Sequence, residues 1–493
     1  MEFSNLTFLY LFLPLTLAVY FLMPDIKKKN IVLLVASLLF FSMGQPLSIV
    51  FLLGSAVLNF FLAQRVVPGK RKTVLLPVCI NIGLLALYKY LDFLLGIFGI
   101  PLPDGGLLLG AQNGITAWIN SLLGTNFAMA TTAAPIGLSF YTFQVIAYQV
   151  DIYRRKYQPQ RLFSLFLLYV SMFPKLLQGP IVRYEQIEAQ LTNRKVKPKA
   201  VYEGALRFVV GLAKKVLIAD YAGKVCTSLS SDSSGAAVWL TALMFMFQIY
   251  FDFSGYSDMA IGLGKIFGFR YCENFDLPYT STSITEFWRR WHMSLGSFFR
   301  DYVYIPLGGN RKGKLRQILN MLAVWALTGL WHGASWNFVL WGLYFFLLLT
   351  VEKQLMPLLE RVPKIVRNLL TMFCVLIGWV FFYYTSMPAL GKALGSLFFP
   401  EKFWSPTVGV QLGNSALLIL LCLIGCSPIP RMIGNIWNNL FLPRGRRQSR
   451  ADVIRLKPMI HAIGIFIFMG LLLWLCTVSL VGSTSAPSIY ASF

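Results

Sequence analysis

The sequence predicts an all-α polytopic membrane protein, and three observations carry that prediction. Hydrophobic residues make up 56% of the chain and charged residues only 13%, and the mean hydropathy is +0.63, values typical of integral membrane proteins. Apolar runs long enough for membrane helices recur from end to end. No long polar stretch interrupts them, so residues 1–493 are expected to form a single integral-membrane domain.

The charge distribution excludes one class of partner and predicts the location. A net charge of +24 would suggest nucleic acid in a soluble protein. Here the basic residues cluster in short loops between apolar runs, as cytoplasmic loops do under the positive-inside rule, where anionic lipid headgroups also attract them. We therefore expect a multi-pass protein of the cytoplasmic membrane that binds no nucleic acid. Seven cysteines, mostly inside apolar runs and without metal-ligand spacing, indicate neither disulfides nor a metal site.

The loop charges give the topology of the N-terminal region. Residues 6–23 are expected to form the first span and not a cleavable signal, because Glu2, and no basic stretch, precedes them. The lysines at 27–29 place the next loop in the cytoplasm and the N-terminus outside. A hairpin that turns at 44–46 then returns to the basic positions 65–72.

The following runs continue the same alternation. Residues 74–95 cross outward, residues 105–131 form a nearly uncharged external segment, and residues 136–152 return to basic positions at 154–156.

The apolar run at 162–177 predicts a segment that dips into the membrane and returns. Pro174 and the Gly179-Pro180 pair interrupt it, and basic residues flank it on both sides. Broken backbone at membrane depth is tolerated only inside protein or beside a cavity. We therefore place the segment near the reaction chamber; the alternative is an ordinary kinked helix end.

The second half of the chain is assigned by the same rules. Residues 204–218 and 236–251 make an out-and-back pair around the Ser-rich turn at 228–235, and the Lys- and Arg-rich residues 256–317 are expected to be cytoplasmic or interfacial. Four aromatic residues should anchor an amphipathic helix there at the headgroups: Trp288, Trp291, Phe298 and Phe299. The later spans are residues 318–331, 338–351, 369–384, 417–423 and 459–480, with a basic loop at 444–450. The total is about eleven or twelve crossings.

His332 is the first candidate for chemistry. It is one of three histidines in the chain, and it lies in an apolar Trp331-His332-Gly333 setting. An ionisable side chain retained at membrane depth is a functional-site hypothesis by default, and a buried neutral imidazole can accept a proton. Asn337, five residues later, could help orient the ring. The alternative is a core histidine that hydrogen-bonds a neighbouring carbonyl.

Seven motifs in a fixed order surround this histidine. They are residues 135–144, 173–175, 179–181, 250–260, 286–295, 298–309 and 330–337. Together they closely resemble the membrane-bound O-acyltransferase family, in particular its bacterial branch with the membrane subunit of alginate O-acetylation and the D-alanyl-lipoteichoic acid transferase.

The resemblance implies an architecture and roles for the histidines. The family fold is a ring of about eleven or twelve tilted helices with re-entrant segments around a central tunnel. His332 matches the family's catalytic histidine and would act as general base. His292 matches the second histidine of the bacterial branch and would orient substrate or stabilise the oxyanion; a structural hydrogen bond at the interface is the alternative. His461 matches no motif and is expected at the interface.

The resemblance also implies substrates and partners for cell-surface or exopolysaccharide O-acylation. No permanently bound cofactor is expected. Acetyl-CoA or another acyl thioester would enter from the basic cytoplasmic side, and the acyl group, an acetyl group in the simplest case, would leave to a hydroxyl of an extracytoplasmic glycan or of a relay protein. A separate secreted or anchored hydrolase-like acetyltransferase would complete the transfer.

Charged side chains within the apolar runs are expected to be neutralised by pairing. Lys89 and Asp92 are three residues apart and could pair on one helix. Asp151 has an arginine three residues later. Asp252 and Asp258, six residues apart, do not share a helical face squarely and would pair with arginine or cap a broken chain.

Two other classes of function fit part of the pattern. A polytopic transporter with His332 as a proton relay would accommodate a buried histidine, carboxylates and broken helices, but it does not account for the ordered acyltransferase-like motifs. A scaffold without chemistry predicts that His332 is dispensable.

Overall fold

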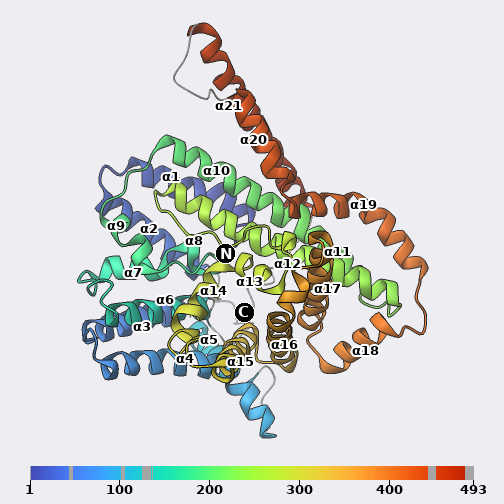
Figure 1. Cartoon of the computed structure of the whole chain (residues 1–493). Coiled ribbons are helices and arrows are strands. Elements are labelled where there is room, and N and C mark those ends of the chain that lie inside the picture. Colours follow the sequence, from blue (N-terminus) through green and yellow to red (C-terminus); the bar gives the residue numbers. More distant parts are fainter. Residues whose placement is uncertain are drawn as a thin grey trace.

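The computed structural model of the chain describes residues 2–43, 48–100, 106–124, 135, 137–441 and 451–482. Every regular element within these ranges is helical (Figure 1), which confirms the all-α prediction. The predicted turn at 44–46 and the basic loop at 444–450 lie outside the described residues.

The elements follow one another closely along the chain. The first half contains η1 (Phe8–Phe12), α1 (Leu13–Leu22), α2 (Ile26–Ser42), α3 (Ser48–Gln64), α4 (Arg71–Ile97), α5 (Leu107–Leu123), α6 (Leu138–Tyr153), α7 (Phe163–Ser171), α8 (Phe173–Leu176), α9 (Tyr184–Thr192), α10 (Pro198–Ala213), η2 (Lys214–Ala219) and α11 (Asp220–Ser228). The second half contains α12 (Gly235–Ile266), η3 (Pro278–Thr280), α13 (Ile284–Arg290), α14 (Met293–Phe299), η4 (Arg300–Tyr304), α15 (Lys314–His332), α16 (Trp336–Leu359), α17 (Lys364–Tyr383), α18 (Met387–Phe398), α19 (Pro406–Cys426), α20 (Ile429–Phe441) and α21 (Ala451–Val481).

Six helices of the described chain are long and apolar enough to cross a membrane. They are α4, α12, α16, α17, α19 and the part of α21 from Pro458 to Val481. This number is smaller than the predicted number of crossings for two reasons. Some apolar runs form shorter helices, such as Phe8–Leu22 and Ser48–Gln64. Others are divided: the run at 162–177 is split into α7 and α8, and the run at 204–218 into α10 and η2. The chain is a multi-pass membrane protein built from long and short helices together.

The extent of the long helix α12 corrects the predicted start of the interfacial segment. The sequence places residues 256–266 in the interfacial segment, but they form the last part of α12. Their small residues do not end the helix; they let α12 approach α10. A Cβ atom on Gly262 would lie 2.6 Å from the Gly204 carbonyl oxygen, and one on Gly255 would lie 2.7 Å from the Gly211 carbonyl oxygen. Only glycine permits two helix backbones to meet this closely.

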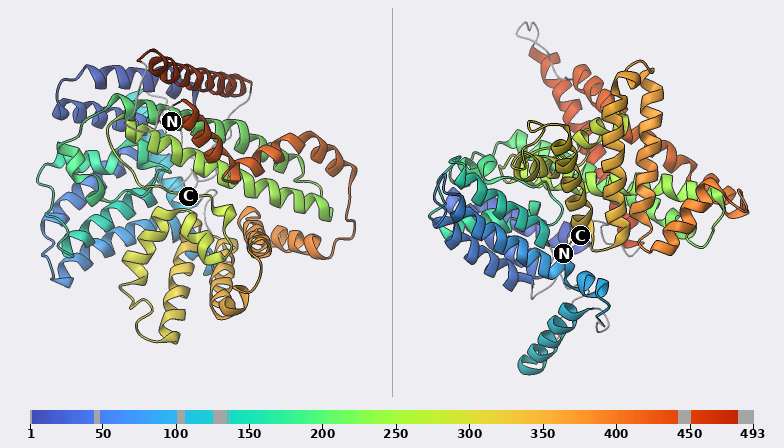
Figure 2. Two further views of the ribbon diagram at one scale, coloured as in Figure 1. Left: turned by 45° about the horizontal axis from the view of Figure 1, so that its top comes forward. Right: turned by 60° about the horizontal axis from the view of Figure 1, so that its bottom comes forward.

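The short helices α13 and α14 lie in the middle of the molecule, between α12 and the α15–α16 pair (Figure 1). α15 and α16 form an antiparallel hairpin, and α12 packs against α10, α11 and α17. Helices α20 and α21 extend away from the body at one edge, where α21 runs beside α10 (Figure 2). The arrangement therefore surrounds α13 and α14 with longer helices.

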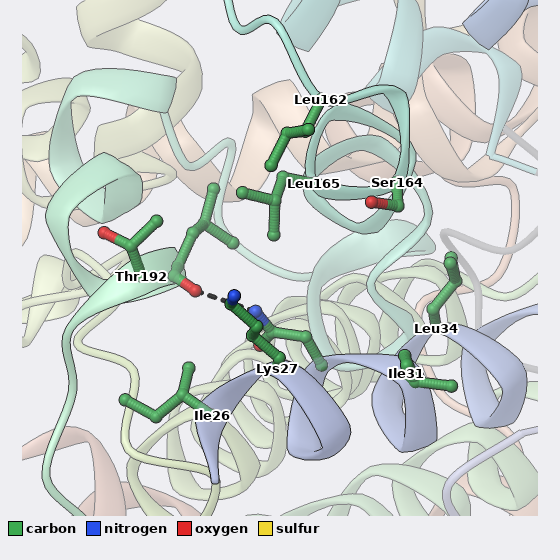
Figure 3. A pocket seen from close by; sticks show the side chains of 10 residues that line it. Ile26, Lys27, Ile31, Leu34, Leu162, Ser164, Leu165 and Thr192 are labelled. Carbon is green, nitrogen blue, oxygen red and sulfur yellow. Dashed lines mark hydrogen bonds between the residues drawn. The ribbon is translucent and has the colours of Figure 1, made fainter.

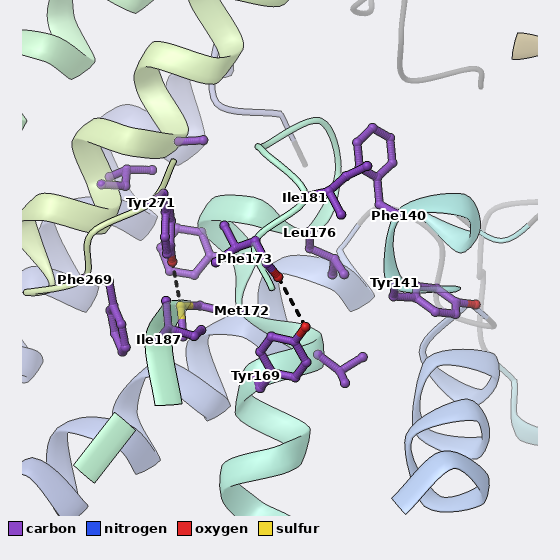
Figure 4. Close-up of a cluster of buried hydrophobic side chains, with 14 of the residues drawn as sticks. Phe140, Tyr141, Tyr169, Met172, Phe173, Leu176, Ile181, Ile187, Phe269 and Tyr271 are labelled. Carbon is purple, nitrogen blue, oxygen red and sulfur yellow. Dashed lines mark hydrogen bonds between the residues drawn. The ribbon is translucent and has the colours of Figure 1, made fainter. Parts of the chain in front are cut away.

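The break in the run at 162–177 is enclosed by protein. Figure 4 shows Tyr169, Met172, Phe173 and Leu176 within a cluster of buried side chains. The Tyr271 hydroxyl donates to the Met172 sulfur at 2.7 Å. The interruption at Pro174 therefore meets the requirement for broken backbone at membrane depth; the topology of the dip itself stays a prediction.

Candidate active site

His332 is the last residue of α15, and its side chain is buried, with 3% of the residue exposed. The helix ends there because Gly333 adopts an extended conformation. Three aromatic rings enclose the imidazole: the ring centroids of Trp331, Trp341 and Phe382 lie 4.7, 4.9 and 5.0 Å away. The predicted burial of His332 in an apolar setting is thus confirmed.

Two glycines hold the end of α15 against α16. A Cβ atom on Gly329 would overlap the Phe338 carbonyl oxygen, and one on Gly342 would lie 2.5 Å from the Trp325 carbonyl oxygen. The two backbones are therefore in contact one helical turn before the histidine. The position of His332 depends on this contact as well as on its own side-chain packing.

Two side chains of α4 bind the last carbonyl groups of α15. The Tyr90 hydroxyl donates to the Leu330 carbonyl oxygen at 2.8 Å, and the Lys89 ammonium donates to the Trp331 carbonyl oxygen. The last carbonyls of a helix have no partner within the helix, and a cation is favoured beside them. Lys89 also lies over the Trp331 ring, 5.6 Å from its centroid. Sequence reasoning missed this contact, which joins residues 242 positions apart.

The predicted pairing of Lys89 with Asp92 is not formed in the described structure. The Asp92 carboxylate instead accepts the backbone N–H of Leu107 at 3.2 Å. The reason is geometric. Lys89 extends toward α15 and binds the Trp331 carbonyl oxygen, whereas Asp92 binds the start of α5.

The predicted arginine partners of Asp151 and Asp258 are confirmed, whereas Asp252 pairs with a lysine and not with an arginine. Asp151 lies 3.8 Å from Arg154 and 3.4 Å from Lys156. Asp252 and Asp258 both have cationic partners on neighbouring helices, which are Lys215 for Asp252 at 2.9 Å, and Arg207 and Lys214 for Asp258 at 2.8 and 2.6 Å. These carboxylates are therefore compensated within the helix packing.

His292 occupies the turn between α13 and α14. Its φ angle is +46°, in the left-handed region that non-glycine residues rarely adopt and that is often found at functional sites. The side chain is buried, and its ring packs edge-on against Phe253 at 4.6 Å. The backbone of this turn therefore aims the imidazole into the protein.

The aromatic residues around this turn do not anchor it at the headgroups, so that prediction is wrong. Trp291, Phe298 and Phe299 are buried in the protein. Trp288 packs against α15 and α16, with its ring 4.8 Å from that of Trp325. The reason is that α13 and α14 lie among longer helices, so their apolar faces meet protein and not lipid.

A hydrogen-bond network holds the His292 ring at its Nδ1 atom. Its Nδ1 lies 3.0 Å from the Asn274 side-chain oxygen, which also lies 2.9 Å from the Ser294 hydroxyl. The Asn274 amide donates to the Ser257 hydroxyl at 3.0 Å. The Ile181 backbone N–H donates to the Ser294 hydroxyl at 3.1 Å, which links the broken segment after α8 to the histidine. Asn274 lies in a loop outside every motif, and no sequence signal pointed to it.

The structure brings the two predicted histidines together around one indole. The Trp331 ring centroid lies 4.7 Å from that of His332 and 5.9 Å from that of His292. His292 lies outside the candidate spans, and burial lowers the pKa of its imidazole to about 3, because a charged ring would lose its hydration. The candidate site, which we call the chamber, is therefore a buried cluster of aromatic side chains that contains two imidazoles.

Two further sequence candidates lie elsewhere. The Asn337 amide donates to the Phe381 carbonyl oxygen at 3.2 Å, so it binds α17 and does not serve as the expected support of His332. His461 pairs with the Asn438 side-chain oxygen at 2.9 Å, between α21 and α20. Neither residue contributes to the chamber.

Comparison with known proteins identifies the family of this chain. The model of the membrane-bound O-acyltransferase family matches residues 154–389, a range that contains both histidines. The "Probable alginate O-acetylase AlgI" of Pseudomonas syringae pv. tomato is 38% identical over 410 residues, which cover 81% of this chain and 75% of the relative. This chain belongs to the membrane-bound O-acyltransferase family.

More distant relatives of this acyltransferase share the same class of chemistry. The "Peptidoglycan O-acetyltransferase" of Helicobacter pylori is 32% identical over 435 residues, covering 80% of this chain and 79% of the relative. The "Teichoic acid D-alanyltransferase" of Bacillus subtilis is 29% identical over 230 residues, covering 44% and 58% of the two chains. The recognition of the family from its motifs is confirmed, and the protein is an enzyme of the membrane.

An aromatic row leads away from the histidines of the acyltransferase. The Trp331 ring lies 6.0 Å from that of Phe143, which stacks on Phe298 at 4.4 Å. Phe298 in turn lies 4.9 Å from Tyr302 on η4. These four rings, from α15, α6, α14 and η4, form a continuous apolar wall.

The row ends at a cluster of basic side chains. The guanidinium groups of Arg154 and Arg183 both lie over the Tyr302 ring, each 5.1 Å from its centroid. Arg183 pairs with Asp301 at 2.7 Å, and the Tyr302 hydroxyl donates to Asp151 at 2.7 Å. The positive-inside rule predicts the cytoplasmic side of the membrane for this cluster. Sequence reasoning identified the basic residues but not the row that joins them to the histidines.

A separate cavity of about 340 Å³ lies between α2, α7 and α9 (Figure 3). Leucine and isoleucine side chains line most of it, and its polar residues are Lys27, Asn30, Ser164 and Thr192. It contains neither histidine. Among the described residues, no group of three or more His, Cys, Asp or Glu side chains is arranged to hold a metal ion.

Proposed function

We propose that this acyltransferase moves an acetyl group from a cytoplasmic thioester, such as acetyl-CoA, to a hydroxyl on the outer side of the membrane, with His332 as general base. The observation that carries the proposal is the enclosure of His332 at the end of α15 by Trp331, Trp341 and Phe382, at 4.7–5.0 Å. A neutral imidazole in such a chamber can accept a proton without competition from water.

The proposed reaction conserves atoms and charge. His332 takes the proton of the acceptor hydroxyl as its oxygen attacks the thioester carbonyl. The C–S bond then breaks, the protonated imidazole returns its proton to the leaving sulfur, and the products are an ester and a free thiol. A general base of this kind contributes about 10²- to 10⁴-fold to the rate, and positioning of both substrates supplies much of the rest.

The aromatic row and the basic cluster support entry of the donor from the cytoplasm. A nucleotide thioester such as acetyl-CoA carries phosphates that suit Arg154 and Arg183, and an apolar arm that suits the wall of Tyr302, Phe298 and Phe143. The row runs from this cluster to Trp331, which contacts both histidines. On this path the thioester carbonyl arrives beside the imidazoles while the nucleotide stays at the surface.

The names of the relatives support a polymer as the final acceptor. They act on alginate, peptidoglycan and teichoic acid, all of which bear hydroxyl groups outside the cytoplasmic membrane. We propose that this chain serves the O-acetylation of an exopolysaccharide of the alginate type. A separate secreted or anchored hydrolase-like acetyltransferase would receive the acetyl group and pass it to the polymer.

The test uses inside-out vesicles that contain the full chain and receive acetyl-CoA labelled in the acetyl group. Label should be transferred covalently to an acceptor in the vesicle lumen by the wild-type protein but not by His332→Gln. His461→Gln is the matched control and should behave like wild type. Translocation of the intact labelled donor without an acyl product would overturn the proposal and favour a transporter.

A further inference from the structure

The orientation of the Asn274 amide is determined by a group that can only donate. The backbone N–H of Ser294 points to the Asn274 side-chain atom that faces His292, at 3.3 Å. A backbone N–H cannot accept a hydrogen bond, so this atom must be the oxygen and not the nitrogen. The amide nitrogen then faces the Ser257 hydroxyl at 3.0 Å.

The Ser294 hydroxyl agrees with this assignment. Its oxygen accepts the Ile181 backbone N–H at 3.1 Å, which leaves its own hydrogen to donate. That hydrogen goes to the Asn274 oxygen at 2.9 Å. The Asn274 oxygen therefore receives hydrogen bonds from both the backbone N–H and the hydroxyl of Ser294.

This polarity determines the tautomer of His292. Because the Asn274 oxygen can only accept, the His292 Nδ1 at 3.0 Å must carry the hydrogen. A neutral imidazole has one N–H, so Nε2 holds a lone pair. Nε2 is buried and has no hydrogen-bond partner among the described residues, although buried polar atoms are rarely left in that condition. Nε2 is thus a hydrogen-bond acceptor that receives no hydrogen bond from the described residues.

We propose that Asn274 is a positioning residue that holds His292 in the Nδ1–H tautomer, so that Nε2 accepts a hydrogen bond from an N–H or O–H of a bound substrate. On this assignment His292 orients a substrate and does not donate to the oxyanion. The inference rests on the proposed acyl transfer for the identity of the substrate, but the tautomer itself can be measured without turnover.

Two substrates could supply the hydrogen. A CoA-type thioester has an amide N–H two carbons from its sulfur, and the acceptor has its hydroxyl. Among the described residues, His332 and Lys89 contact the same Trp331 ring as His292. Asp252 and Asp258 of α12 and Glu273 beside Asn274 all lie in ion pairs.

The first experiment measures the tautomer directly. Nitrogen NMR of the full chain labelled with ¹⁵N-histidine should show, for the signals lost in His292→Gln, a protonated Nδ1 and an unprotonated Nε2 at neutral pH. A protonated Nε2 or an imidazolium would overturn the proposal. Because no substrate is present, a failure of acetyl transfer would not affect this result, so the two proposals are tested separately.

The second experiment changes the charge at position 274. In Asn274→Asp a carboxylate would accept the Nδ1–H and favour imidazolium, so the acidic limb of the kcat/KM profile should move to higher pH and activity should recover in alkaline buffer. Asn274→Ala should lower activity at every pH without moving the limb. Asn438→Asp, beside His461, is the same substitution in a second Asn–His pair and should leave the profile unchanged. A limb that stays in place in Asn274→Asp would contradict the positioning role.

The third experiment identifies the source of the hydrogen. S-acetyl-N-acetylcysteamine carries the amide N–H of the donor arm, and its ester analogue has oxygen at that position. The wild type should use the amide roughly tenfold better or more, and His292→Ala should lose the preference. Equal use of both thioesters by the wild type would assign the hydrogen to the acceptor hydroxyl. A preference that persists in His292→Ala would show that Nε2 does not receive the amide and would overturn that assignment.

Discussion

The two histidines of the chamber are held in opposite ways. His332 is held by backbone: its helix ends at the residue itself, glycines press that helix against α16, and Lys89 and Tyr90 bind the last carbonyls. His292 is held by side chains, because Asn274 binds its ring directly while its own backbone adopts a left-handed turn. The base of the proposed reaction is thus positioned through the backbone of its helix, whereas the ring that presents one defined nitrogen is fixed by a polar network.

Replacement of His332 should give the largest effect. We expect His332→Ala and His332→Gln to lose about 10²-fold or more of the acyl-transfer rate, because they remove the base, while expression and detergent stability stay near wild type. The measurement is initial rate together with size-exclusion behaviour of the purified chain. Retention of more than about a tenth of the activity would remove His332 from the role of base.

Replacement of His292 should lower activity less than replacement of His332, and two variants at position 292 should differ in activity. His292→Gln retains a polar group that can accept a hydrogen bond, so we expect it to keep roughly tenfold more activity than His292→Ala. Neither variant should move the acidic limb of the pH–rate profile, because the pKa of the buried His292 imidazole, about 3, lies below the assay range. If both variants were equally inactive while His332→Gln remained active, the two roles would be exchanged.

The glycine contact should affect stability and activity together. Gly329→Ala would place a methyl group on the Phe338 carbonyl oxygen, so we expect a cost of about 1–3 kcal/mol in stability and a displaced His332. The midpoint of thermal unfolding in detergent measures the first effect. Gly391→Ala on α18, where nothing lies within 4 Å of the new methyl group, is the control; equal stability of both variants would show that the contact is not required.

Substitutions of Lys89 and Tyr90, which cap the last carbonyls of α15, should cause the smallest losses of activity, in a graded series. Lys89→Met removes a charged donor and should lower activity about tenfold, and Tyr90→Phe removes a neutral hydrogen bond worth about 0.5–1.5 kcal/mol. Lys89→Arg should recover part of the loss, since it keeps a cation at the end of α15. Lys392→Met, on an exposed position of α18, controls for loss of charge. Activity of Lys89→Met at the wild-type level would separate the cap from catalysis.

The sequence predicted the parts of this site that carry a local signal. The all-helical fold follows from composition, and both histidines follow from their motifs. Lys89 was assigned to Asp92 because a spacing of three residues is visible in a sequence, whereas its contact with Trp331 spans 242 positions. Asn274 carries no signal at all, since a polar residue in a loop becomes informative only when its partners are known.

The errors in the fold have one physical cause. Residues 256–266 of α12 were predicted to be cytoplasmic or interfacial, and the aromatic residues of α13 and α14 were predicted to anchor a helix at the headgroups. In the structure Gly255 and Gly262 face α10, and Trp291 and Phe298 face other helices. Composition cannot distinguish a surface that contacts lipid from one that contacts protein, because both are apolar.

The contact between Lys89 and the end of α15 also has a consequence for biosynthesis. α4 leaves the ribosome long before α15, because 242 residues separate Lys89 from Trp331. A lysine at membrane depth without a partner is costly, so the nascent chain carries an unsatisfied charge until the later helix is inserted. Lys89 then gains its hydrogen-bond partner at the same step in which α15 brings His332 into place. A chain truncated before α15 would retain an unpaired lysine that membrane quality control can detect.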